Sequence, residues 1–282
     1  MPKRIRTIIQ KLHAWLDDLT GRVLAPRTRL DYLTTTSVDK TPINEQTIQY
    51  YTYSQHYHFL HFTCPPVHLS KYAYLSDLKV YQDLLTYTFI IQNFKPGARL
   101  LEIGGGNSRI IEALSSQYEF WNLDKFEGHG HGPTTPKCTH GFRQVYDFIG
   151  TYNRDLPDQY FDGVYSISTL EHVPADTIIQ ANILKDINRI LRPGGWSFHC
   201  IDLLLGQQGY NRSNGIIEYF YQHQPMINPQ ASINEIRNNP DLYTLSSYQY
   251  YTRWLLLTRI IPLKRFGYPF SYNLLWRKSG GK

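Results

Sequence analysis

Three consecutive glycines follow a short apolar run in the middle of the chain, and an acid stands just before them. Residues 100–108 are Leu-Leu-Glu-Ile-Gly-Gly-Gly-Asn-Ser. A glycine turn at the end of a strand lets a ligand approach the backbone closely. Arg109 stands where a dinucleotide fingerprint has its third glycine, and the Gly-Lys-Ser/Thr ending of a phosphate-binding loop is missing. An acid here would repel a pyrophosphate but suits a ligand with a cationic amino-acid part. The residues expected to line this ligand are Glu102, Gly104, Gly106 and Asn107.

Two further carboxylates follow apolar segments at spacings that suit a nucleoside. Asp124 lies twenty residues beyond Gly104, where a carboxylate at the end of a strand can bind both ribose hydroxyls. Asp147 and Phe148 end the next segment, and together they supply a carboxylate that accepts from an amide beside an aromatic face. We therefore expect Asp124 at a ribose and the Asp147-Phe148 pair at an adenine.

These side chains need strands and helices in alternation to position them. The apolar runs and the 3,4 spacings predict strands at 99–103, 120–124, 142–147, 162–167 and 196–201, and helices at 108–114 and 175–191. Pro193-Gly194-Gly195 stops the second helix. Alternating strands and helices indicate a parallel sheet with right-handed crossovers.

The motifs also have a familiar order. The glycine turn, Asp124 and Asp147 are followed by Phe-Asp-Gly-Val-Tyr-Ser-Ile-Ser-Thr-Leu-Glu-His-Val at 161–173 and by Arg-Ile-Leu-Arg-Pro-Gly-Gly at 189–195. This set resembles the class I S-adenosylmethionine-dependent methyltransferases, in particular the group whose fourth strand reads FDxVxSxxxLEHV. The resemblance covers roughly residues 96–205.

The resemblance implies a cofactor, S-adenosylmethionine, and a role for each matching residue. Glu102, Gly104 and Gly106 would line its methionine part, while Asp124 would bind the ribose. Asp147 and Phe148 would hold the adenine, and Ser166 would offer a backbone contact below the sulfonium. Two departures matter: Ser108 replaces the family's third glycine and can open the helix instead, and the loop at 127–141 replaces the usual helix between strands two and three.

Methyl transfer is an in-line displacement, so alignment of the reacting groups accounts for most of the catalysis. A hydroxyl acceptor must also lose its proton. His172, just past the fourth strand, is the candidate base, and Asp202, after the fifth strand, is a second candidate. The alternative for Glu171-His172 is that the pair caps the following turn and shapes the pocket, and Asp202 is alternatively a simple loop acid.

A group of histidines and cysteines suggests a metal, but the spacing argues otherwise. The potential ligands are His56, His58, His61, Cys64 and His68, and later His129, His131, Cys138 and His140. Their spacing matches no closed zinc template. We expect no metal site and an aromatic, polar surface segment instead.

The positive charge belongs to the two ends of the chain. Its 29 basic and 23 acidic residues give a net charge of +6, yet residues 1–30 alone carry 7 basic and 2 acidic side chains, and residues 242–282 carry 7 basic and none acidic. Residues 5–19 follow the pattern of a basic amphipathic helix, which could lie on an anionic membrane. Solvated surface charge is the plainer alternative. Nucleic acid is not expected, since no RNA-binding signature accompanies the basic residues.

Tyrosine is also concentrated in the flanks. Of 23 tyrosines, 9 lie in residues 31–95 and 9 in residues 207–282. These flanks stand where this fold places its substrate cap, so their tyrosines could form a wall for a sugar or aryl substrate or could equally be core. The tyrosines in question are Tyr50, Tyr51, Tyr53, Tyr57, Tyr248, Tyr250 and Tyr251.

The sequence as a whole predicts an α/β chain with a Rossmann-like, doubly wound, seven-stranded sheet in three αβα layers, whose last strand is antiparallel. Residues 1–95 would form a helical extension that includes a helix at 77–91, residues 96–205 the cofactor-binding core, and residues 206–282 a C-terminal cap. The predicted function is O- or N-methylation of a small molecule, a glycan or a lipid-linked precursor. The alternatives are a non-catalytic protein that holds the cofactor or its product, and an RNA methyltransferase. Three widely spaced cysteines and no apolar run of about 20 residues favour a reduced, cytoplasmic location, with or without peripheral membrane contact.

Overall fold

The structure is a computed structural model that describes residues 41–63, 77–128, 132–136, 141–206, 209–211, 214–255 and 261–280. Its strands are β1 (Arg99–Ile103), β2 (Glu119–Leu123), β3 (Phe142–Val145), β4 (Phe161–Ile167), β5 (Leu191–Gly206), β6 (Gly209–Asn211) and β7 (Tyr268–Arg277). Its longer helices are α4 (Asp77–Asn93), α5 (Arg109–Leu114), α6 (Thr177–Ile190), α7 (Ile216–His223) and α8 (Ile233–Asn238). Its short helices are η1 (Ile48–Tyr51), η2 (His56–Leu60), η5 (Leu170–His172), α9 (Ser247–Gln249), the π-helical turn η6 (Tyr250–Trp254) and α10 (Leu263–Phe266).

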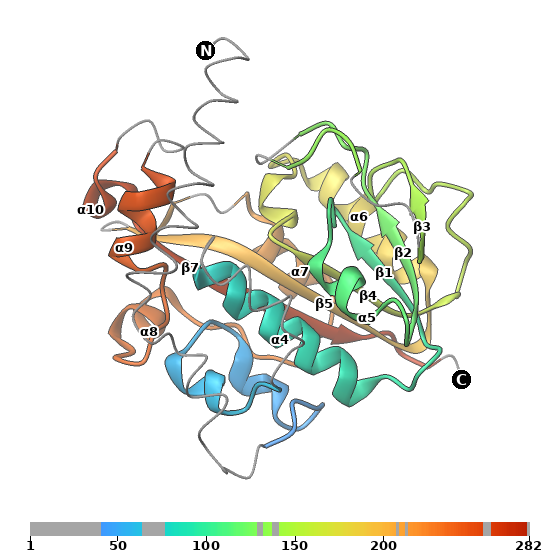
Figure 1. The fold of residues 1–282 in the computed structure, drawn as a ribbon, viewed down its shortest axis with the longest axis horizontal. Helices are drawn as coiled ribbons and strands as arrows, with labels where there is room; N and C mark the ends of the chain where they lie inside the picture. The colour runs from blue at the N-terminus through green and yellow to red at the C-terminus, as the bar shows by residue number, and fades with distance from the viewer. Residues whose placement is uncertain are drawn as a thin grey trace.

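One mixed sheet runs through the molecule, and helices cover both of its faces (Figure 1). Its strand order is β3-β2-β1-β4-β5, with β7 antiparallel on the far edge of β5. The strands from β3 to β5 are parallel to their neighbours. Among the described residues six strands therefore lie side by side. The seventh, β6, is a three-residue partner of the last residues of β5.

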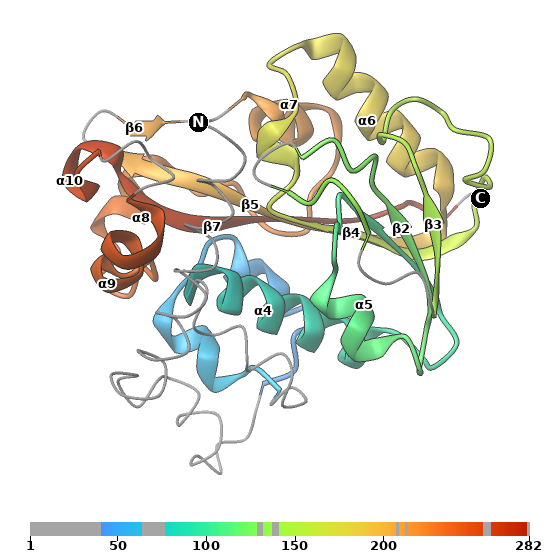
Figure 2. The ribbon, with the colours of Figure 1, turned by 45° about the horizontal axis from the view of Figure 1, so that its top comes forward.

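The two faces of the sheet carry separate hydrophobic clusters. Figure 2 shows α4 and α5 on one face and α6 and α7 on the other. Side chains such as Leu85, Ile111 and Phe198 are buried on the first face, and Ile187, Phe220 and Trp276 on the second. This arrangement has the three layers of an α/β Rossmann-like fold.

Strand β5 is longer than the sequence predicts, and this length shapes one end of the molecule. Its pairing with β4 ends at Cys200, whereas its pairing with β7 continues to Leu205. Beyond the last residue of β4, β5 and β7 continue as a two-stranded ribbon. Helices α8, α9 and α10 gather at this end in Figure 1, and Tyr250, Leu263 and Phe266 bury Leu204 of the ribbon. The expected strand at 196–201 is thus the inner part of a longer strand, which extends past the carboxyl end of β4.

The outer edge of β7 is bonded to segments that are far away in the sequence. The backbone N–H of Ser54 donates to the carbonyl of Ser271 at 2.9 Å, and the N–H of Asn273 donates to the carbonyl of Thr52 at 2.7 Å. The Ser54 hydroxyl donates to the carbonyl of Tyr243 at 2.7 Å. The described N-terminal segment is therefore tied to both the last strand and the C-terminal segment.

This packing decides the role of several flank tyrosines. Tyr51, Tyr53 and Tyr250 are buried in the hydrophobic clusters, so they belong to the core. The remaining four, Tyr50, Tyr57, Tyr248 and Tyr251, are exposed. For the three buried rings the structure thus selects the core alternative, whereas the four exposed rings remain candidates for a substrate wall.

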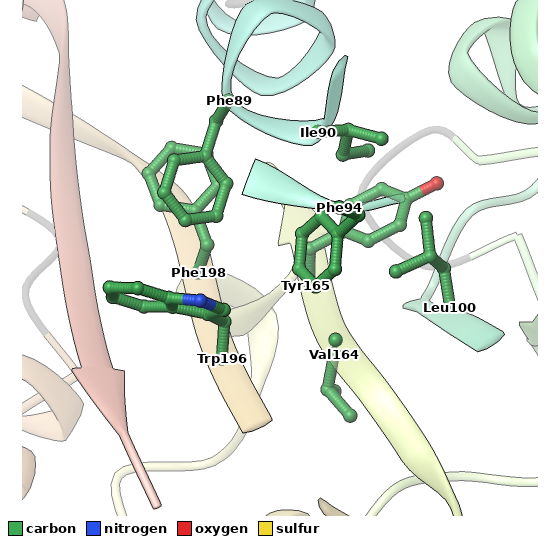
Figure 3. Close-up of a pocket in the computed structure, with 9 residues that line it drawn as sticks. Phe89, Ile90, Phe94, Leu100, Val164, Tyr165, Trp196 and Phe198 are labelled. Atoms are coloured by element: carbon green, nitrogen blue, oxygen red, sulfur yellow. The ribbon is translucent and has the colours of Figure 1, made fainter. Parts of the chain in front are cut away.

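A free volume among the described residues is small and apolar. It lies between the end of α4 and the early residues of β1 and β4, where Phe94, Leu100 and Tyr165 are among its lining (Figure 3). Its volume is about 10 Å³, room for at most about one water molecule. It is a packing defect of the core and lies away from the carboxyl ends of the strands.

The start of α6 gives a direct test of one local structure. Asp176 caps this helix and accepts hydrogen bonds from the backbone N–H groups of Ile178 at 2.7 Å and Ile179 at 3.1 Å. We expect Asp176→Ala to lower the free energy of unfolding by about 1 kcal/mol, the usual value of such a cap. Chemical denaturation measures the change, with Asp155→Ala, an exposed acid in a loop, as the matched control. Equal stability of the two variants would contradict the assignment.

Within the described residues, no helix is both long enough and apolar enough to cross a membrane. The basic amphipathic helix predicted at 5–19 lies outside the described residues.

Candidate active site

The glycine turn joins β1 to α5 at the carboxyl end of the sheet. Gly104 and Gly106 adopt left-handed backbone conformations, with φ of 65° and 53°. The intervening Gly105 is pressed against the layer below, since a Cβ there would lie 2.6 Å from Asn122 Oδ1. Such a turn tolerates no side chain at these positions. Asn107 follows in the same turn and is half-buried.

Glu102 lies beneath this turn and is almost completely buried. Its Oε2 atom accepts a hydrogen bond from the Tyr165 hydroxyl at 2.8 Å and another from the Ser108 hydroxyl. Burial raises the pKa of Glu102 to about 7, although these two hydrogen bonds and the charge of Arg109 oppose the rise. In this structure Glu102 supports the turn from below.

Ser108 confirms the expectation that it opens the helix in place of a third glycine. Its hydroxyl caps α5 by accepting from the N–H of Ile111 at 3.0 Å. Arg109, the first residue of α5, forms a two-pronged ion pair with Asp83 of α4 at 2.5 and 2.9 Å. The ion pair fixes α5, and with it the turn, against α4.

Asp124 directly follows β2, the strand next to β1 and its glycine turn. Its Oδ2 accepts from the N–H of Gly106 at 2.8 Å and its Oδ1 from the N–H of Phe126 at 2.7 Å. A carboxylate has about four acceptor positions, so two of them are left for other donors. Asp124 thus lies beside the turn and can hold a pair of hydroxyls.

Asp147 and Phe148 follow β3, one strand further out. Partial burial raises the pKa of Asp147, but hydrogen bonds from the Phe148 N–H, Asn153 and Thr151 and the charge of Lys125 outweigh it, so the pKa lies below its usual range. The ring of Phe148 is exposed, and Lys125 Nζ lies 4.8 Å from its centroid. The pair offers an ionised carboxylate beside an exposed aromatic ring.

Ser166, near the end of β4, has its side chain turned into the core. Its hydroxyl lies 2.8 Å from Nδ1 of His199, whose Nε2 lies 2.8 Å from the Ser197 hydroxyl. Burial lowers the pKa of His199 to about 3, so this imidazole is neutral. Any ligand contact made by Ser166 therefore comes from its backbone.

The loop after β4 lies directly against the glycine turn. Ser168 has a left-handed backbone, with φ of 51°, and the Thr169 hydroxyl donates to the carbonyl of Gly104 at 3.4 Å. Glu171 and His172 form the short helix η5 that follows. The side chain of His172 is 42% exposed, that of Glu171 only 6%, and the two approach to 3.8 Å between His172 Nε2 and Glu171 Oε1.

Asp202 lies across from this loop, on the projecting part of β5. It accepts hydrogen bonds from Lys79 Nζ at 3.0 Å, Gln82 Nε2 at 2.6 Å and the Ser168 hydroxyl at 2.8 Å. Burial alone raises the pKa of Asp202, but the charge and the hydrogen bond of Lys79, with those of Ser168 and Gln82, hold it below its usual range. An anion stabilised in this way is a poor proton acceptor and a good electrostatic anchor.

The sequence analysis missed the contribution of α4. One face of this helix carries Lys79, Gln82 and Asp83 at helical spacing. Lys79 bonds to Asp202, Gln82 to Ser168, and Asp83 to Arg109. Polar residues at this spacing are a signal, but one that usually marks a solvated helix face. For Glu171 the sequence offers only the alternative in which the Glu171-His172 pair caps the following turn and shapes the pocket.

The predicted residues thus divide into two adjacent groups at the carboxyl ends of the strands. In the first group, the glycine turn follows β1, Asp124 follows β2, and the Asp147-Phe148 pair follows β3. In the second group, His172 follows β4, and Asp202 lies on the part of β5 that extends beyond β4. Among the described residues, no group of three or more His, Cys, Asp or Glu side chains could hold a metal ion. His58 of the suspected cluster is buried against Tyr81 and Tyr50, whereas Cys64, His68, His129, His131, Cys138 and His140 lie outside the described residues.

The first group fits S-adenosylmethionine by its donor chemistry. The turn offers backbone to the methionine part, Asp124 keeps acceptor positions for the ribose hydroxyls, and Asp147 with Phe148 suits the adenine. Beneath the turn, Asn122 Oδ1 is buried and accepts no hydrogen bond from a described residue. The glycine turn thus leaves no room for a side chain, and a hydrogen-bond acceptor beneath it has no partner among the described residues. Both features are expected at a ligand site.

The buried Glu102 predicts a dependence of stability on pH. Its pKa in the folded state, about 7, lies above the ordinary value of 4.5, so the native state binds this proton more tightly than the unfolded chain. Stability is therefore lost as the pH rises from about 4.5 to about 7. We expect Glu102→Gln to lose less stability than the wild type between pH 5 and pH 8, by on the order of 2 kcal/mol. Urea unfolding at the two pH values measures this, and Glu112→Gln, on the exposed side of α5, serves as control. Parallel pH profiles for wild type and Glu102→Gln would refute it.

Comparison with known proteins agrees with this geometry. A family model described as a methyltransferase domain matches residues 74–238, more than half of the chain. No curated protein sequence matches. A cyclopropane synthase from Mycobacterium tuberculosis is 15% identical, with 66% of this chain and 80% of that chain covered and a TM-score of 0.43.

Two further solved structures resemble the chain. A phosphoethanolamine N-methyltransferase from Haemonchus contortus, in complex with S-adenosylhomocysteine, is 15% identical over 90% of this chain and 60% of that chain, with a TM-score of 0.42. A methyltransferase from an antibiotic biosynthesis pathway of Anabaena variabilis is 14% identical over 49% of this chain and 45% of that chain, with a TM-score of 0.32. The chain spans less than two thirds of the length of these two proteins. With the family match over residues 74–238, the chain belongs to the class I S-adenosylmethionine-dependent methyltransferases, and its cofactor is S-adenosylmethionine.

Proposed function

We propose that this methyltransferase methylates an oxygen or a nitrogen of a small molecule, a glycan or a lipid-linked precursor, and that the acceptor enters where β4 ends and β5 continues past it. The observation that carries this proposal is the polar group formed there by Glu171, His172, Asp202 and Lys79. It stands next to the glycine turn because Thr169 touches Gly104. An acceptor in this place would lie beside the cofactor site.

The cofactor supplies an electrophilic methyl group on a sulfonium, so the protein must orient the acceptor and remove its proton. His172 is the proposed base, because it is the exposed member of the group and an imidazole exchanges protons near neutral pH. Asp202 is better suited to fix the site through Lys79, Gln82 and Ser168 than to accept a proton.

Calorimetry with S-adenosylmethionine and its demethylated product is the first test, followed by transfer of a labelled methyl group into fractionated cell extracts. We expect binding of both ligands and label in the small-molecule, glycan or lipid fraction. Binding without any labelled product would favour a non-catalytic protein, label in the RNA fraction would favour an RNA methyltransferase, and failure to bind either ligand would overturn the proposal.

With the acceptor identified, His172→Gln tests the base. We expect kcat to fall at least about tenfold and its dependence on pH between 6 and 9 to flatten, while the affinity for the cofactor is kept. Unchanged turnover across that pH range would reject His172 as the base.

We also propose a peripheral contact with anionic membranes through the basic ends of the chain. In the described part, Lys264 and Arg265 are exposed on α10 near the exposed Tyr248 and Tyr268, a combination that suits the membrane interface. Flotation with anionic and with neutral vesicles tests this. We expect binding to the anionic vesicles that weakens with added salt, and absence of binding at low salt would reject it.

A further inference from the structure

Glu171 differs from the other buried acids of this protein. Both of its carboxyl oxygens are buried and neither accepts a well-formed hydrogen bond from a described residue, although the backbone N–H groups of Glu171 and Asp202 act weakly on the carboxyl. By contrast, Asp186 accepts from the N–H groups of Gly150 and Tyr152 and from Arg189. Glu102, Asp83 and Asp162 are bonded as well. A buried polar group without partners costs roughly 1–3 kcal/mol, so an unsatisfied carboxyl here points to a partner that arrives from outside.

The surroundings of Glu171 indicate the charge of that partner. The charges of Asp202 and Lys79 both act on Glu171, with opposite effects on its pKa. Lys79 is already paired with Asp202 at 3.0 Å between Nζ and Oδ2, and His172 Nε2 lies 3.8 Å from Glu171 Oε1. Because Lys79 is taken up by Asp202, an ionised Glu171 would have no cation of its own in the free protein. The cluster therefore has room in its charge balance for a second cation.

A neutral hydroxyl and an ammonium group would both give Glu171 a hydrogen bond, but only the ammonium also balances its charge. Bonds from a charged donor are roughly twice as strong as neutral ones, and attraction to both acids adds to them. The ammonium group of Lys79 already donates a hydrogen bond to the neighbouring Asp202 carboxylate. The site therefore favours a cationic donor.

We propose that the acceptor of this methyltransferase is an amine, and that its ammonium group binds to the Glu171 carboxylate beside Asp202. This inference rests on the proposed function and selects nitrogen as the methylated atom. Glu171 is then the residue that distinguishes an amine acceptor from an alcohol.

The bonds and charges of the reaction balance with the groups present. The bound ammonium loses one proton to His172, so one N–H bond breaks and one N–H bond forms on the imidazole. The freed nitrogen lone pair forms the new carbon–nitrogen bond as the carbon–sulfur bond of the donor breaks and leaves its electron pair on sulfur. The product is a methylated ammonium, still paired with Glu171.

The protonation of Glu171 supplies a readout that needs no knowledge of the acceptor. Burial, with the charge of Asp202, raises the pKa of Glu171 to about 8, and the charge of Lys79 and the backbone N–H groups of Glu171 and Asp202 only partly oppose this. At pH 7 the free protein therefore holds Glu171 as the neutral acid. A bound ammonium stabilises the carboxylate, so Glu171 releases its proton when the cation binds.

The experiment uses the full chain with carboxyl-labelled ¹³C-glutamate in the presence of S-adenosylhomocysteine, at pH 7. Methylammonium chloride is titrated in, with methanol and sodium chloride as parallel titrations. We expect methylammonium alone to shift the Glu171 carboxyl signal to the position of the ionised form. Glu171→Gln removes that signal, and Glu112→Gln, an exposed acid on α5, leaves it in place. Should Glu171→Gln fail to fold, the signal is identified in the wild type by its titration near pH 8.

Three results would overturn the inference. These are no shift with methylammonium, the same shift with sodium chloride at equal ionic strength, or a response to methanol alone, which would indicate a hydroxyl acceptor. The two proposals fail separately. A protein that binds S-adenosylhomocysteine but ignores methylammonium keeps the methyltransferase proposal and loses the amine, whereas failure to bind S-adenosylhomocysteine defeats the proposed function whatever Glu171 does.

Discussion

An Asp124→Ala variant is expected to bind S-adenosylhomocysteine about 100-fold more weakly than the wild type. The carboxylate follows β2 next to the glycine turn and retains acceptor positions beyond those used by Gly106 and Phe126. Two hydrogen bonds from ribose hydroxyls to a charged group are worth about 1.5 kcal/mol each, and about 3 kcal/mol corresponds to roughly 100-fold in affinity. The turn would also lose the acceptor that holds the N–H of Gly106.

Calorimetry measures this effect, and two companion variants separate its causes. Asp124→Asn keeps one oxygen acceptor and should bind with intermediate affinity. Glu127→Ala removes an exposed acid in the same loop, one that pairs with Lys125, and should bind as the wild type does. Affinity within about threefold of the wild type in a folded Asp124→Ala protein would remove Asp124 from the cofactor site.

A Gly104→Ala variant is expected to lose about 3 kcal/mol of stability together with cofactor binding. The residue has a φ of 65°, which costs an alanine roughly 1–2 kcal/mol. Its Cβ would also overlap the side chain of Thr169, and such overpacking costs roughly 1–3 kcal/mol. The loop that carries Glu171 and His172 would then have to move away from the turn.

A double-mutant cycle distinguishes the two costs. Thr169→Ala removes the overlapping groups but leaves the backbone strain, so Gly104→Ala with Thr169→Ala should recover only part of the lost stability. Gly280→Ala, where a Cβ meets nothing within 4 Å, is the neutral control. If the single and double variants unfold at the same denaturant concentration, the contact between turn and loop does not determine the effect.

The cofactor half of the site follows from local sequence. A glycine turn, a capping serine and a carboxylate at the end of a strand each have a meaning that depends on a few neighbouring residues. Ser108 caps α5 as predicted, and β1, β2 and β4 begin or end within one residue of their expected positions. These features could be predicted because the backbone alone dictates them.

The acceptor half could not be predicted in the same way, because it is assembled by tertiary packing. Lys79 and Asp202 are more than a hundred residues apart, and only the placement of α4 across the sheet brings them together. Burial likewise changed the meaning of Glu171, from a residue that caps a turn to an acid without a bonding partner. The flank tyrosines divided between core and surface for the same reason.

The bonded outer edge of β7 also bears on whether this sheet can pair with a strand of another molecule. A terminal strand normally offers a row of free backbone groups to a strand of another molecule. Here the carbonyl of Pro269 accepts from Leu245, residues 271 and 273 bond to the segment around Ser54, and both backbone groups of Leu275 are bonded near Ile227 and Asn228. Three irregular segments, none of them a strand, thus occupy this edge of the sheet. The segments from the two flanks therefore leave β7 without the row of free backbone groups through which sheets of different molecules join.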